Sequence, residues 1–104
     1  MIYHITDRDS WNKALSSGLY SPESLYSDGY IHCSFFSQVK YTKENYFRGV
    51  YGLIVLCIDE NRLKSEYRTE KGSGRSESDL FPHIYGTLNT DAVCDTLELD
   101  IWTG

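Results

Sequence analysis

Three histidines are the residues of this chain best suited to acid–base chemistry, and each begins the same short pattern. His4, His32 and His83 are each followed by an apolar residue and then by a hydroxyl, in the segments HIT, HCS and HIY. Imidazole changes its charge near neutral pH, so it serves as a general acid, a general base or a metal ligand. The repeated pattern raises the hypothesis that the three rings act together.

Strand geometry predicts which side chains accompany each histidine. Residues two apart in a strand point to the same face of a sheet. If the three segments are extended, the pairs that share a face are His4 with Thr6, His32 with Ser34, and His83 with Tyr85. We expect these faces to converge on one cleft.

Three other interpretations of the histidines stay open. In the first, each ring is a core or edge residue that bonds its own neighbouring hydroxyl, as buried polar groups normally do. In the second, the three imidazoles hold zinc, but no HxH or HxxxH spacing places two ligands on one element, so we expect no metal. In the third, Cys33 is a nucleophile, although alternation points it away from His32.

Composition limits the class of protein. With 104 residues, of which 40% are hydrophobic and 14% aromatic, the chain is expected to form one globular domain over residues 1–104. A net charge of −5 disfavours a long nucleic-acid partner, though a single nucleotide held by local donors is compatible with it. The longest apolar run, residues 52–58, is too short to cross a bilayer, so no membrane partner is expected.

The cysteines and the first residues indicate the compartment. Cys33, Cys57 and Cys94 are odd in number and contain no CxxC motif. Cys57 and Cys94 lie in apolar runs, so we predict buried free thiols in a reducing cytoplasm. The first residues resemble a strand rather than a signal peptide, which also favours a cytoplasmic location.

Two helices are expected early in the chain. Residues 7–18 resemble a helix capped by Asp7 or Asp9 and ended by Gly18, with Trp11, Ala14 and Leu15 on one face. A second helix is expected over residues 38–49. The expected caps are Ser37 for this helix and Ser21 for a single helical turn over residues 21–25.

Most strands are expected late in the chain. The continuous apolar run at 52–59 predicts a central strand buried on both faces, and 66–70 a more polar strand. Pro82 predicts an edge strand or extended loop, after a mobile loop over 71–79. A half-buried last strand is predicted from the alternation of Val93, Leu97, Leu99 and Ile101. The predicted class is α+β, with a largely antiparallel sheet.

The segments around the histidines resemble a known family. IHCS (31–34) and FPHIYG (81–86), at this separation, resemble the small bacterial domain-of-unknown-function family 952, and the resemblance covers nearly the whole chain. That family is generally placed with the ADP-ribosyltransferase-like fold, which implies a split antiparallel sheet. YHIT (3–6) is similar to the first strand of diphtheria-toxin-like transferases and poly(ADP-ribose) polymerases, where a histidine contacts NAD. The histidine at position 32 resembles the residue found at this place in the RNA 2′-phosphotransferase branch of the fold.

The resemblance implies an enzyme that breaks the nicotinamide–ribose bond of NAD, by glycosyl transfer or by hydrolysis. Such a bond breaks through an oxocarbenium-like state, which positioned groups can stabilise. His4 would bond a ribose hydroxyl or the nicotinamide amide, with Thr6 orienting its ring. His32, with Tyr30 or Phe36, would form a stacking wall. NAD is therefore the expected substrate or ligand.

The third motif departs from that pattern. The transferases place a glutamate on a later strand, whereas this chain has His83 there, which we expect to act as general acid or base or to bind an anionic acceptor. Glu70 ends the preceding strand and is the candidate glutamate. The other expected ligand contacts are Ser34, Tyr85 and the pyrophosphate candidate Arg68, with Lys71 and Arg75 as weaker candidates.

Two other functions stay open. One is a non-catalytic nucleotide or small-ligand binding module that kept the cleft and lost the glutamate. The other is a protein-interaction domain that uses the nine tyrosines, whose rings give large contact area with a polar tip. The sequence predicts neither the acceptor nor the oligomeric state.

Overall fold

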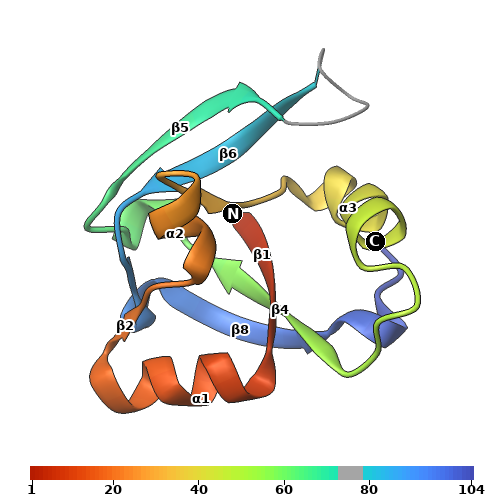
Figure 1. Ribbon diagram of the computed structural model, residues 1–104, viewed down its shortest axis with the longest axis horizontal. Coiled ribbons are helices and arrows are strands. Elements are labelled where there is room, and N and C mark those ends of the chain that lie inside the picture. The colour runs from red at the N-terminus through yellow and green to blue at the C-terminus, as the bar shows by residue number, and fades with distance from the viewer. Residues whose placement is uncertain (73–78) are drawn as a thin grey trace.

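Two antiparallel three-stranded sheets form the framework in this computed structural model, which describes residues 1–72 and 79–104 (Figure 1). The first has the order β1-β4-β8 and comprises Ile2–Asp7, Leu53–Ile58 and Val93–Glu98. The second has the order β3-β6-β5 and comprises Ile31–His32, Leu80–Tyr85 and Glu66–Lys71. The predicted α+β class with antiparallel sheets is confirmed.

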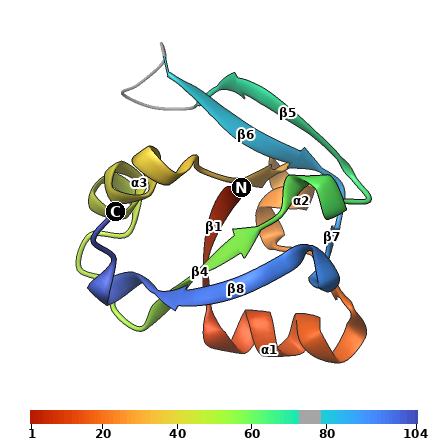
Figure 2. The same cartoon turned by 180° about the vertical axis from the view of Figure 1, so that it is seen from behind.

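Shorter elements complete the chain. A two-stranded ladder pairs β2 (Leu19–Tyr20) with β7 (Leu88–Asn89). The helices are α1 (Arg8–Ser17), α2 (Glu23–Ser27) and α3 (Val39–Tyr46). Single 3₁₀ turns span Phe36–Gln38, Glu60–Arg62, Thr90–Ala92 and Leu99–Ile101. In the two opposite views, α1 lies below the first sheet and the β5–β6 hairpin lies above it (Figures 1 and 2).

Strand β4 is the buried centre of the first sheet, as its apolar run predicts. Ile54 and Leu56 pack with α1 residues on one face, and Val55 packs in a second cluster on the other face. All three side chains are 2% exposed or less. A strand covered on both faces requires apolar residues at consecutive positions, which explains the continuous run.

Helix α1 forms where the capping residues predict it. The Asp7 side chain accepts a hydrogen bond from the Ser10 N–H at 2.7 Å, and Gly18 ends the helix with a φ of 84°. Trp11 is buried against the first sheet, but Leu15 is 54% exposed. The expectation that Leu15 shares the buried face is wrong, because this amphipathic helix contacts the sheet along a narrower stripe.

The prediction that Pro82 makes its segment an edge is wrong. Strand β6 is the central strand of the second sheet, and Pro82 is fully buried in it. The Cys33 N–H donates to the Pro82 carbonyl at 3.0 Å, beyond the last residue of β3. The proline nitrogen therefore faces the end of a two-residue strand, where a missing donor costs no ladder bond.

Two predicted caps are replaced by other residues. Helix α2 begins at Glu23 after Pro22, which has no side-chain cap bond, so Ser21 does not cap it. Before α3, the Gln38 side chain accepts from the Phe35 N–H at 2.9 Å in place of the predicted Ser37 cap.

The last strand and one cysteine are more exposed than predicted. All β8 residues after Val93 are exposed, and β8 is an edge strand of the first sheet. Cys94 is exposed with them, whereas Cys33 and Cys57 are buried, and all three thiols are free. None of the described helices is long and apolar enough to cross a membrane.

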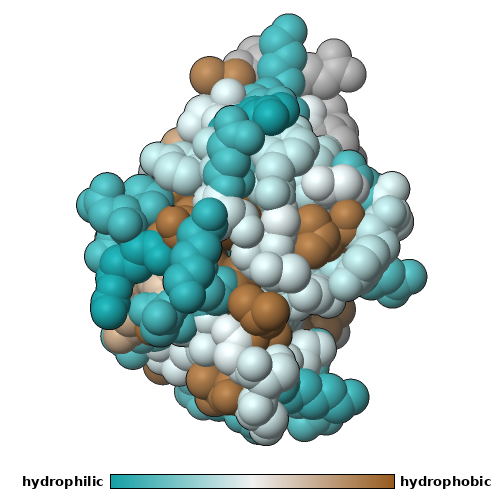
Figure 3. All heavy atoms as spheres, turned by 90° about the vertical axis from the view of Figure 1, so that its left-hand side faces the viewer, coloured by the Kyte–Doolittle hydropathy of each residue, from teal (hydrophilic) through white to brown (hydrophobic). Residues whose placement is uncertain are grey.

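The sheets are joined, and the surface is mixed in character. Tyr3 of β1 and Ser34 exchange two backbone hydrogen bonds, of 2.8 and 2.7 Å, and so link the first sheet to the segment that follows β3. The side of the molecule seen in Figure 3 is largely hydrophilic, with small separate hydrophobic patches. Most of the loop predicted at 71–79, including Arg75, lies outside the described residues.

Candidate functional site

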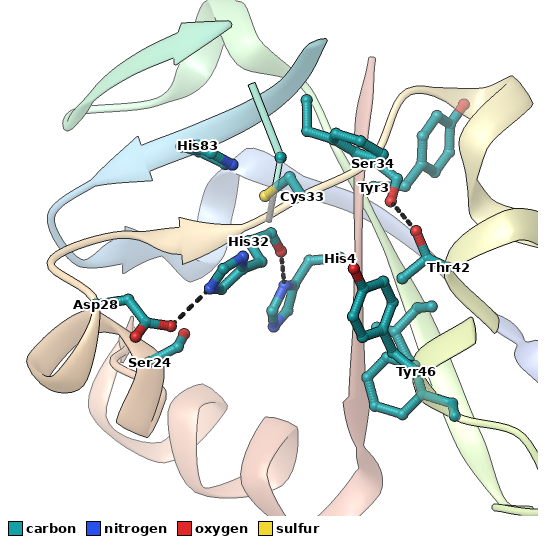
Figure 4. A pocket seen from close by; sticks show the side chains of 14 residues that line it. Tyr3, His4, Ser24, Asp28, His32, Cys33, Ser34, Thr42, Tyr46 and His83 are labelled. Atoms are coloured by element: carbon teal, nitrogen blue, oxygen red, sulfur yellow. Dashed lines mark hydrogen bonds and ion pairs between the residues drawn. The ribbon is translucent and has the colours of Figure 1, made fainter. Parts of the chain in front are cut away.

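A cavity of about 410 Å³ lies where the two sheets meet. Its lining includes all three histidines, which come from β1, β3 and β6 (Figure 4). Ser34, Thr42 and Asp28 add further polar groups to it. Three imidazoles that are far apart in sequence thus lie around one space, as the repeated pattern led us to expect.

His4 is held by two internal contacts. Its Nδ1 donates to the His32 backbone carbonyl at 2.5 Å, and its Nε2 lies 2.7 Å from the Tyr20 hydroxyl. The same hydroxyl lies 2.9 Å from Thr6 Oγ1. We expected Thr6 to orient the His4 ring directly. It does not, because the Tyr20 hydroxyl lies between the two side chains. Thr6 is also absent from the cavity lining.

Burial controls the charge of His4. The ring is 8% exposed, and desolvation lowers its pKa to about 4, so it is neutral at pH 7. A neutral ring that donates from Nδ1 must accept at Nε2, so Tyr20 supplies the hydrogen of that bond. Burial also raises the pKa of Tyr20 to about 12, which keeps its hydroxyl protonated.

His83 forms a carboxylate–imidazole pair with Glu70. Its Nδ1 lies 3.1 Å from Glu70 Oε1, and the Tyr85 hydroxyl donates to the same oxygen. Desolvation lowers the pKa of His83, although the Glu70 bond opposes this shift. The two donors lower the pKa of Glu70. A neutral ring that donates Nδ1–H to a carboxylate carries its lone pair on Nε2, which has no hydrogen-bond partner among the described residues.

His32 pairs with a residue that the sequence analysis did not single out. Its Nε2 lies 2.8 Å from Asp28 Oδ2, and both side chains are partly exposed at the cavity wall. The rings of His32 and His83 are edge-on, with centroids 5.7 Å apart. Two of the three histidines are thus supported by carboxylates from neighbouring elements.

The remaining ring and charged residues lie beside the cavity on the same face of the second sheet. Tyr30 stacks on His83, with centroids 4.0 Å apart and planes 14° apart. Arg68 lies 4.4 Å over the Tyr85 ring and pairs with Glu66 at 3.2 Å. None of the predicted residues Tyr30, Arg68, Glu70 and Tyr85 contributes to the cavity lining itself.

The structure separates Ser34 from Phe36. Ser34 lines the cavity, with its Oγ 3.0 Å from Thr42 Oγ1. Phe36 instead packs against Tyr3 and Trp102 at a separate hollow of about 210 Å³. Phe36 therefore does not form the stacking wall that we expected, because the chain turns into a 3₁₀ helix directly after Phe35.

Several residues of the site had no clear signal in the sequence. Tyr20 lies in a two-residue strand, and Thr42 is one polar residue among many on α3. Asp28 precedes a glycine with a φ of 86°, and the turn there brings the Asp28 carboxylate to His32, four residues later. An Asp-Gly pair indicates a turn, but a turn alone does not indicate which side chain its aspartate will meet.

Metal binding has no support among the described residues. No group of three or more His, Cys, Asp or Glu side chains there is arranged to hold an ion. Each histidine ring has instead at least one nitrogen engaged by a protein group.

Comparisons with known proteins agree with the fold. A family model described as a protein of unknown function (DUF952) matches residues 5–96. Crystal structures of the protein CC0527 from Caulobacter crescentus and of its double mutant each have a TM-score of 0.81 and 28% identity, covering 93% of this chain and 83% of that chain. Its solution NMR structure has a TM-score of 0.77, with 28% identity over 93% and 82% of the two chains. No curated protein matches.

Proposed function

This chain belongs to DUF952, a family of proteins of unknown function, and on that premise we propose that it has the ADP-ribosyltransferase-like fold and cleaves the nicotinamide–ribose bond of NAD. The observation that carries the proposal is the single cavity lined by His4, His32 and His83. Its size, about 410 Å³, falls within the range of roughly 300–1,000 Å³ typical of small-molecule sites.

His83 is the proposed base. The bond between ribose C1′ and the nicotinamide nitrogen breaks, and its electron pair returns to the ring, which leaves as neutral nicotinamide. The oxygen of water or of an acceptor hydroxyl bonds to C1′, and its proton passes to His83 Nε2. Glu70 holds Nδ1 of that ring and so fixes the tautomer that can accept the proton.

His4 and His32 have a positioning role in this proposal. His4 fixes the backbone of β3 through its bond to the His32 carbonyl, so the two rings keep their relative placement. Asp28 holds the His32 ring at the opposite wall. Groups held in place before the substrate arrives lower the barrier without further reorganisation.

Release of nicotinamide from NAD by the purified protein tests the proposal. Glu70→Gln keeps the size of the side chain but removes the carboxylate, and should lower the release rate about 100-fold, in the range of general-base contributions. The matched control is Glu66→Gln, on the same face of β5, which contacts Arg68 and not His83. The absence of release by the wild-type protein, or equal loss in both variants, would refute the base role.

A non-catalytic binding module is the second candidate. It is favoured by the position of Glu70, which contacts His83 from outside the cavity lining. In that case saturating NAD should raise the melting temperature, since a ligand at about 100 times its Kd stabilises by about 2.7 kcal/mol. No nicotinamide would be released. Measuring melting temperature and release on the same sample separates the two functions.

A further inference from the structure

The cavity lining carries no fixed positive charge in the described part of the chain. Its members include neither lysine nor arginine, and Asp28 is its one carboxylate. Proteins that grip phosphate groups supply Arg, Lys or a helix N-terminus as donors. The lining is therefore poorly suited to a phosphate group.

The histidines do not reverse this balance. His4 and His83 are buried, and desolvation favours their neutral forms. His32 is paired with Asp28, so that pair carries a net charge of zero when the ring is protonated and of −1 when it is not. In either state, the described residues of the lining present no net positive charge to a ligand.

Arg68 does not supply the missing charge. It lies outside the lining, and its guanidinium binds both carboxylate oxygens of Glu66, at 3.3 and 3.2 Å. Glu70 is a further carboxylate on the same face. With one cation beside two carboxylates, this face has no net positive charge and offers a pyrophosphate no electrostatic anchor.

The rest of the lining suits a cationic aromatic ring. Four aromatic side chains contribute to it: Tyr3, Tyr46, Phe47 and Phe81. Aromatic faces attract cations, and a carboxylate adds to that attraction. At about 410 Å³, the cavity can enclose one end of a dinucleotide but not the whole molecule.

We propose that the cavity recognises the N-riboside of a cationic aromatic base and makes no contact with phosphate, so that nicotinamide riboside, its mononucleotide and NAD are equivalent ligands. The proposal rests on the function proposed above and narrows its substrate class. Asp28 selects the positive charge of the ring, and the phosphates of the longer ligands lie outside in solvent.

Calorimetric titration with the three oxidised compounds tests this recognition. Affinities within about threefold of one another are expected at both 50 and 200 mM salt, because contacts to phosphate would make the affinities for the mononucleotide and NAD fall more steeply with salt than that for the riboside. Arg68→Ala should leave all three unchanged. Binding of NAD at least tenfold tighter than the riboside, or a selective loss of NAD affinity in Arg68→Ala, would overturn the proposal.

The reduced riboside isolates the role of charge. Dihydronicotinamide riboside is neutral with the same heavy atoms, and should bind about fivefold or more weakly than the oxidised form. Asp28→Asn should abolish this preference, whereas Asp95→Asn, an exposed carboxylate on β8 outside the lining, should keep it. Equal affinity for both forms in the wild-type protein would contradict the assignment to Asp28.

Nicotinamide release, measured in parallel, separates this inference from the function on which it rests. Equal binding of the three ligands without release would refute catalysis and support the recognition. Release from NAD with no binding of the riboside would support catalysis and refute the recognition. If none of the compounds binds, both are refuted.

Discussion

The two sheets have the same number of strands and the same antiparallel pairing, yet their central strands are built differently. Strand β4 is covered on both faces, and Val55, Leu56 and Ile58 are fully buried in it. Strand β6 is apolar on one face, through Pro82 and Ile84. Its other face presents Phe81, His83 and Tyr85.

This difference indicates that the first sheet mainly stabilises the fold, whereas the second mainly supplies the groups that contact a ligand. The first sheet has more buried aliphatic side chains than the second, which presents rings and charges on the face beside the cavity. His4 belongs to the first sheet, but its imidazole also lines the cavity. Changes in the first sheet should therefore affect folding, and changes in the second should affect ligands.

The largest expected effect compares a leucine in each central strand. Leu56→Ala removes a fully buried side chain from β4 and should lower the free energy of unfolding by about 3 kcal/mol. Leu80→Ala changes a leucine of β6 that is 49% exposed, and should cost less than about 1 kcal/mol. Urea unfolding measures both. Similar losses would remove the distinction between the sheets.

The next largest effect is a loss of folding stability at acidic pH. Unfolded histidine binds a proton near its ordinary pKa of about 6.5, whereas folded His4 does so near a pKa of about 4. The unfolded state therefore binds more protons between these values, so acidification lowers stability. The expected loss from His4 between pH 7.5 and pH 5 is roughly 2 kcal/mol.

A variant without this imidazole sharpens that test. Urea unfolding of His4→Asn at both pH values should show a much smaller loss, with a remainder from His83, whose pKa is also lowered. An equal loss in both proteins would show that His4 does not resist protonation.

A smaller effect is expected at the hydroxyl that supports His4. Tyr20→Phe leaves His4 Nε2 and Thr6 Oγ1 without their partner, which should cost about 1–2 kcal/mol. Tyr26→Phe is the matched control, because Tyr26 is 77% exposed and should change stability very little. If thermal unfolding shows no difference between these variants, the internal contact does not stabilise the first sheet.

The smallest effect is expected at Phe36. Phe36→Ala removes a ring that is 52% exposed and lies outside the cavity, so it should cost less than about 1 kcal/mol. Its affinity for nicotinamide riboside should equal that of the wild-type protein. A loss of affinity in calorimetric titration would show that Phe36 contributes to ligand binding.

Local signals allowed parts of the fold to be predicted from the sequence. Asp7 and Gly18 mark the ends of α1 because capping depends on a few neighbouring atoms. The run containing Val55 predicts β4 because burial on both faces requires apolar residues at every position. The shared cavity of the histidines followed from their repeated pattern, which is a weaker signal.

The failures arise from contacts distant in sequence. Pro82 tolerates a central position because β3 is only two residues long, which no local pattern shows. Tyr20, the partner of His4, was missed for the same reason, since it lies in a two-residue strand. Asp28 is close to His32 in sequence, but a turn does not indicate which side chain its aspartate will meet. Propensity indicates elements, whereas tertiary placement decides which polar groups meet.

The bridge between Tyr3 and Ser34 has a mechanical consequence. The Tyr3–Ser34 pair of hydrogen bonds and the adjacent bond from His4 Nδ1 to the His32 carbonyl hold β1 against the β3 segment at neighbouring positions. Separation of the two sheets must therefore break these bonds together, and slow exchange of the Ser34 amide hydrogen would record that this junction stays closed.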